Sequence, residues 1–65
     1  MKSPLETRII DLYHLARTAL AGMPTVPSRY DRMIYVKKEL LRSYPELIAG
    51  MGNKAVWFKI EEVLS

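Results

Sequence analysis

The chain of 65 residues contains no cysteine and only one histidine, His14. Without cysteine it can form no disulfide, no thiolate nucleophile and no thiolate metal site. Asp11 lies three residues before His14, a spacing that predicts a local surface pair on one helix and not a catalytic triad. One histidine without cysteine is also too little for a transition-metal site. We therefore expect that the protein is not an enzyme and holds no metal or cofactor.

Long uncharged apolar runs are missing as well. None approaches the ~18 residues that a membrane-spanning helix requires. Glu6, Arg8 and Asp11 interrupt the N-terminal region where a signal peptide would need an apolar stretch. These absences predict a cytoplasmic protein that does not act in a membrane.

What the chain does contain is a large share of hydrophobic residues, 49% of the total. Residues 1–65 can form one domain at most, and a chain this short buries only about 60% of its unfolded surface. Some apolar groups must therefore stay exposed or be covered by a second copy of the chain.

The net charge of +3 is concentrated in one segment. Between residues 28 and 44 there are five basic and two acidic residues, which gives five minus two, or +3. The basic residues are Arg29, Arg32, Lys37, Lys38 and Arg42, and the acidic ones are Asp31 and Glu39. This is a mild basic bias, much weaker than that of a polybasic tail.

Helix-start signals and apolar spacing predict two long antiparallel helices. Ser3 with Glu6, and Ser28 with Asp31, match the capping box, in which each side chain bonds to the other residue's backbone N–H. The first helix is predicted near residues 4–22, ended by glycine and proline, and the second near 28–43. Their apolar stripes are Leu5, Ile9, Leu12, Ala16, Ala19, Leu20 and Met23, then Met33, Val36, Leu40 and Tyr44, widened by Tyr30, Ile34 and Leu41.

The remainder predicts a short helix and a C-terminal helix. Pro45 suits the first turn of a short helix with Ser43 or Tyr44 as its cap, and Gly50 is a natural stop. Asn53 is the expected N-cap of the last helix, residues 54–64. No period-2 strand pattern is present, so the predicted fold class is all-α.

The segment from Glu46 to Leu64 also has the parts of a helix-turn-helix. A recognition helix needs side chains near its N-terminus that reach base edges, chiefly Arg, Lys, Asn or Gln. The last helix offers Asn53, Lys54 and Lys59, contains no arginine, and continues into two glutamates that repel phosphate. We therefore favour the alternative that the glycines let this helix pack back over the other two.

One face of the second helix collects basic and aromatic residues. At about 100° per residue, Arg32, Tyr35, Lys38 and Arg42 fall on the side away from the Met33–Leu40 stripe. Such a face could contact an acidic protein surface or a nucleic-acid backbone, or it could simply be solvated with local ion pairs.

Phe58 is a hydrophobic residue that lies off the apolar stripe of the last helix. It lies ~200° round the last helix from Val56, so it points away from a core that contains Trp57. It could be an ordinary exposed ring or an anchor in an interface, where aromatic residues are favoured. Ile10, Tyr13 and Leu15 likewise extend the apolar arc of the first helix beyond what one hairpin covers. We therefore predict a homodimer with Ile10, Tyr13, Trp57 and Phe58 in its interface.

The half of the chain from Ser28 to Ser65 resembles small phage and prophage accessory proteins. The matching parts are "RYDRM" at the start of a helix, a proline after that helix, and the final "AVWFKIEEVL". The resemblance implies a helical, often dimeric protein that binds a host protein, and it implies no catalytic residue.

The predicted function is a protein-binding module that modulates another protein by inhibiting it. The predicted contacts are Arg32, Tyr35, Lys38, Arg42 and Phe58, and the alternative is a small DNA-binding transcriptional regulator.

Overall fold

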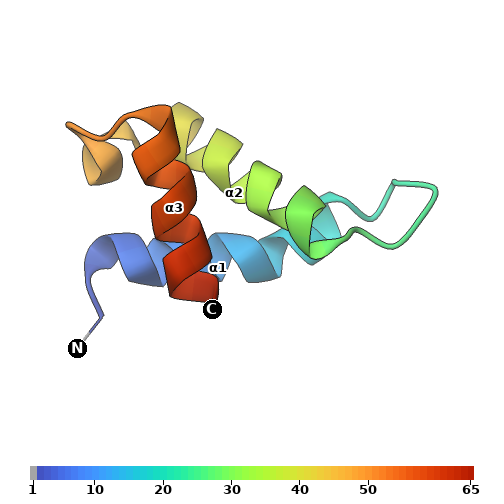
Figure 1. Cartoon of the computed structure of the whole chain (residues 1–65). Coiled ribbons are helices and arrows are strands. Elements are labelled where there is room, and N and C mark those ends of the chain that lie inside the picture. Colours follow the sequence, from blue (N-terminus) through green and yellow to red (C-terminus); the bar gives the residue numbers. More distant parts are fainter. Residues whose placement is uncertain (1) are drawn as a thin grey trace.

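The computed structural model describes residues 2–65, and within that range the secondary structure is entirely helical. Three α-helices, α1 (Pro4–Ala19), α2 (Arg29–Ser43) and α3 (Asn53–Leu64), are joined by loops and by one short 3-10 helix, η1 (Pro45–Ile48). Helices α1 and α2 run antiparallel, and α3 crosses them, as Figure 1 shows. The all-α prediction, with its helical hairpin, short helix and C-terminal helix, is confirmed.

Both predicted capping boxes are present. The Ser3 hydroxyl accepts from the Glu6 N–H at 3.2 Å, and the Glu6 carboxylate accepts from the Ser3 N–H at 3.4 Å. At the start of α2, the corresponding distances between Ser28 and Asp31 are 3.1 and 3.0 Å. Each box satisfies two N–H groups that a helix start would otherwise leave unpaired.

Two predicted boundaries were wrong. Helix α1 ends at Ala19 and not near residue 22, because tight turns take over: the Ala21 N–H donates to the Thr18 carbonyl and the Met23 N–H to the Leu20 carbonyl. Asn53 is not the N-cap of α3. Gly52 takes that place in an extended conformation, and its carbonyl accepts from the Val56 N–H at 3.0 Å.

The turn between η1 and α3 depends on Gly50. Its φ of +83° lies in the left-handed region, where a side chain would be strained. Gly52 has a φ of −80°, which any residue adopts, so only the first of the two glycines is required by the backbone.

The core lies where the three helices meet. Side chains from α1, α2, η1 and α3 contribute to it at the spacing that the apolar stripes predict. The buried set is Ile9, Leu12, Ala16, Met33, Val36, Leu40, Ile48, Val56 and Ile60. No polar or charged residue in the range 2–65 is buried with them, so the centre of the domain is purely apolar.

Candidate functional site

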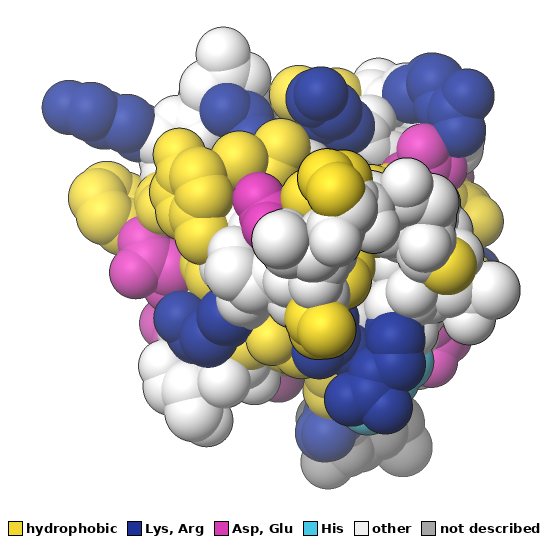
Figure 2. Space-filling model, turned by 90° about the vertical axis from the view of Figure 1, so that its right-hand side faces the viewer, with side chains coloured by type: hydrophobic (Ala, Val, Ile, Leu, Met, Phe, Trp, Pro, Cys, Tyr) yellow, Lys and Arg dark blue, Asp and Glu magenta, His cyan; other side chains and the backbone are white. Residues whose placement is uncertain are grey.

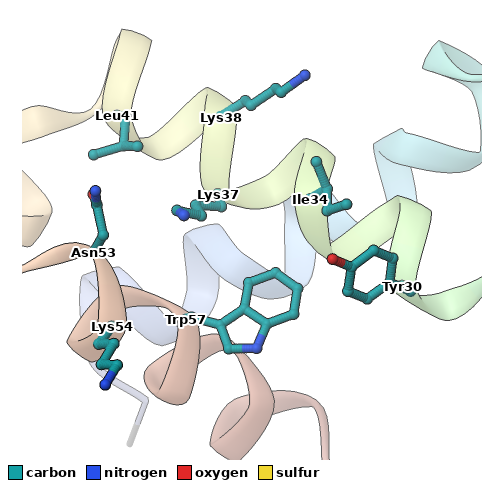
Figure 3. A pocket seen from close by; sticks show the side chains of 8 residues that line it. All are labelled: Tyr30, Ile34, Lys37, Lys38, Leu41, Asn53, Lys54 and Trp57. Carbon is teal, nitrogen blue, oxygen red and sulfur yellow. The ribbon is translucent and has the colours of Figure 1, made fainter.

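A hollow of about 600 Å³ lies on the surface between α2 and the first half of α3. We call it the α2–α3 groove. Four of its residues are apolar or aromatic, three are lysines and one is an asparagine. Figure 3 shows the lining residues, which are Tyr30, Ile34, Lys37, Lys38, Leu41, Asn53, Lys54 and Trp57.

The groove exists because α2 carries more apolar residues than the core covers. Met33, Val36 and Leu40 face inward and are buried, whereas Tyr30 and Leu41 are 62% and 45% exposed. Residues 30, 34, 37 and 41 follow one another at three- and four-residue steps, with residue 38 beside them, so they form a second stripe along the same helix. Helix α3 crosses α2 at an angle, covers only the inward stripe, and leaves the second one open (Figure 1).

Trp57 closes one end of the groove. Its ring makes an edge-to-face contact with Tyr30, with the ring centroids 5.6 Å apart, and Trp57 also packs against the core. In Figure 3, these two rings lie side by side, whereas Leu41 and Asn53 lie at the opposite end. Trp57 is the only tryptophan of the chain, so tryptophan fluorescence reports on a single side chain that lines this groove.

The groove has positive charge on its borders. Lys38 and Lys54 point away from its centre on opposite sides, and Lys37 lies between α2 and α3 (Figure 3). The two ion pairs of residues 2–65 are Arg42 with Glu39 and Lys59 with Glu62, so neither involves a lysine of the groove. Figure 2 views the molecule from the right-hand side of Figure 1, and there too basic side chains lie beside hydrophobic ones.

The acidic side chains nearest in sequence are engaged elsewhere. Asp31 is held in the capping box with Ser28, and Glu39 pairs with Arg42 at 2.6 Å. On α3, Glu62 pairs with Lys59 at 3.0 Å and raises the pKa of that lysine through their hydrogen bond. The first turn of α3 carries no acidic residue, so the partial positive charge of its N-terminus adds to that of Lys54.

The four residues predicted as one binding face of α2 have different environments. Arg32 is half-buried and engaged with α1: its Nε and one terminal nitrogen donate to the Tyr13 carbonyl oxygen at 3.2 and 2.9 Å. Tyr35 packs against the core. Arg42 is exposed but paired with Glu39, and Lys38 is exposed and lines the α2–α3 groove. Helical spacing placed these residues on one face, but it could not show how far the long Arg32 side chain reaches.

The predicted interface residues are also dispersed. Tyr13 is half-buried, with its ring beneath the Arg32 guanidinium, and Trp57 is half-buried beside Tyr30. Ile10 is half-buried on α1, and Phe58 on α3 is 62% exposed. Of the four, Phe58 is the side chain that most clearly remains available for an interface.

The described residues show few features of other kinds of site. Within residues 2–65, no three histidine or acidic side chains gather closely enough to hold a metal ion. His14 is exposed on α1 beside Tyr13, and the two rings are 6.5 Å apart. Over the same range, no helix combines the length and the apolar character that crossing a membrane requires.

Comparison with known proteins finds no matching family model, no similar curated protein and no similar solved structure. The resemblance to phage accessory proteins therefore stays a prediction, and the α2–α3 groove is interpreted from its own chemistry.

Proposed function

We propose that this protein is a small helical interaction module that docks on another protein through the α2–α3 groove and modulates the activity of that protein. The observation that carries the proposal is the groove itself. It combines four apolar or aromatic residues with three lysines that have no ion-pair partner among residues 2–65, on a domain that has a separate buried core.

Exposed aromatic and aliphatic side chains at one place are typical of docking surfaces. Tyrosine and tryptophan are enriched among the residues that dominate binding energy in protein interfaces. Tyr30 and Trp57 hold each other in a defined geometry, so less side-chain entropy is lost when a partner covers them. Docking would modulate the partner's activity if the surface that it covers is one that the partner needs for that activity.

Nucleic-acid binding is the second candidate, because Lys37, Lys38 and Lys54 could contact phosphates. The groove favours protein for two reasons. Among residues 2–65, its lining contains no arginine, the residue that most often reads bases, and half of that lining is apolar or aromatic where a phosphate backbone would need polar contacts.

Position-specific photo-crosslinking tests the proposal. A photoreactive amino acid replaces Leu41 in the groove, and in a matched control it replaces Leu15, an exposed leucine on α1. We expect the Leu41 position, and not the Leu15 position, to crosslink to one specific protein in cells that produce this chain. Equal crosslinking at both positions, or crosslinking to nucleic acid at Leu41, would contradict the proposal.

A further inference from the structure

We infer that the α2–α3 groove binds an acidic amphipathic helix of its partner. This inference rests on the proposed docking function and specifies the chemistry of the segment that is bound. It is carried by the combination of an apolar and aromatic stripe with three lysines in one lining, and not by the hollow alone.

The shape of the groove fits a helix of about three turns. The lining residues of α2 extend from Tyr30 to Leu41, which corresponds to roughly 17 Å at the rise of an α-helix. A helix that lies along such a groove presents apolar side chains on one face, at positions i, i+4, i+7 and i+11. The anchor at i would contact Tyr30 and Trp57, the one at i+4 would contact Ile34, and the one at i+11 would contact Leu41.

The charge of the groove selects acidic side chains beside these anchors. Lys38 on the α2 border and Lys54 on the α3 border point outward on opposite sides (Figure 3). A bound helix therefore meets a lysine on each side of its apolar stripe, and Lys37 adds a third between the two helices. Among the described residues, no carboxylate lines the groove, so acidic side chains of the partner would face no like charge from this lining.

The two ion pairs of α2 and α3 do not involve the groove lysines. Arg42 and Lys59 already have carboxylate partners within this chain, at 2.6 and 3.0 Å. The three groove lysines have none in residues 2–65, so a partner's carboxylates can pair with them without displacing an internal contact. Complementary charge of this kind raises association rates and selects among partners more than it adds affinity.

The test uses two synthetic helical peptides and the fluorescence of Trp57. One peptide has leucines at i, i+4, i+7 and i+11 with glutamates beside them, and the other has lysines in place of the glutamates. We expect the acidic peptide to change the Trp57 emission saturably and to bind about tenfold more tightly than the basic one, with weaker binding at higher salt.

A matched pair of variants locates the effect. The groove variant carries Lys37→Glu, Lys38→Glu and Lys54→Glu. The control variant carries Lys2→Glu, Arg17→Glu and Arg29→Glu, which are exposed residues outside the groove. Both change the net charge from +3 to −3, since each reversal subtracts two. We expect the groove variant to lose about tenfold in affinity for the acidic peptide and the control to lose much less.

The alternatives give different results. Equal binding of both peptides would overturn the inference of an acidic partner but leave the proposed docking function standing. A protein crosslink specific to the Leu41 position, without binding of either peptide, would have the same meaning. An equal loss of affinity in both variants would also overturn the inference. Emission that changes with protein concentration alone, without peptide binding, would assign the groove to a second copy. If an oligonucleotide saturates the Trp57 signal and the acidic peptide cannot displace it, both the inference and the proposed function fail.

Discussion

The guanidinium carbon of Arg32 on α2 lies 3.9 Å from the centre of the Tyr13 ring on α1, and two of the arginine nitrogens donate to the Tyr13 carbonyl oxygen. One side chain thus joins the two long helices by a cation–π contact and a forked hydrogen bond. Arg8 lies in a similar position over the Tyr44 ring, at 4.4 Å, and joins α1 to the end of α2.

Replacing Arg32 should therefore reduce stability more than replacing other arginines does. We expect Arg32→Ala to lower the free energy of unfolding by about 1–3 kcal/mol, because both the charged hydrogen bonds and the ring contact are lost. Arg32→Lys should recover only part of this loss, since lysine lacks the planar fork. Urea unfolding measures both, with the exposed Arg29→Ala as control. An unchanged midpoint for Arg32→Ala would show that the contact contributes nothing.

Replacing a capping serine should reduce stability more than replacing another surface serine does. Ser3→Ala and Ser28→Ala each remove the acceptor for an N–H in the first turn, and each should cost roughly 0.5–2 kcal/mol. Ser43→Ala, at the end of α2, should cost much less because Ser43 is not part of a capping box. Thermal unfolding of the three variants provides the comparison, and a similar effect at all three positions would contradict it.

Acid should weaken the first capping box. The hydrogen bonds from Ser3 lower the pKa of Glu6 below its ordinary value. A carboxyl group with a lowered folded-state pKa contributes stability above its unfolded-state pKa, and this contribution is lost as the pH falls through the folded-state value. Glu6→Gln should therefore reduce the difference in melting temperature between pH 7 and about pH 3. Glu46→Gln, outside the box, is the control, and an equal reduction there would argue against a specific role for Glu6.

Lys38 and Arg42 should differ in binding although both are exposed. We expect Lys38→Glu with Arg42→Glu to leave the fold nearly intact, because exposed charges contribute little to stability. Partner binding should fall, and the single Lys38→Glu variant should account for most of the loss because only Lys38 lines the groove. Arg42 is paired with Glu39 instead. Binding assays of the single and double variants decide this, and a larger effect of Arg42→Glu would show that the binding surface was wrongly placed.

The homodimer stays a prediction, and it now depends mainly on Phe58. This side chain is 62% exposed, and it points about 100° round α3 from Trp57. Self-association through Phe58 should make the melting temperature rise with protein concentration, and Phe58→Glu should give a less stable monomer. Sedimentation at micromolar concentration tests this directly. A single species of 7.5 kDa for the parent chain would exclude the dimer.

Local sequence signals determined the secondary structure. These signals are the two capping boxes, the prolines and the positive-φ Gly50, and each involves only four to six neighbouring residues. The positions of the helices could therefore be predicted from them. The apolar stripes likewise predicted the buried faces, because a helix repeats its orientation every 3.6 residues. The predicted end of α1 and the predicted N-cap of α3 were wrong. At both places several neighbouring residues could end or cap the helix, and small differences in backbone conformation decide among them.

The binding surface was decided by the tertiary structure. From the sequence, Arg32, Tyr35, Lys38 and Arg42 formed one face, but contacts with α1, the core and Glu39 engage three of them. Lys54 and Trp57 join Lys38 only because α3 crosses α2 at that point. The second stripe at Tyr30, Ile34 and Leu41 was visible in the sequence as a widening of the apolar face. Which part of that stripe stays open depends on the angle and position at which α3 packs, and helical periodicity contains no information about either.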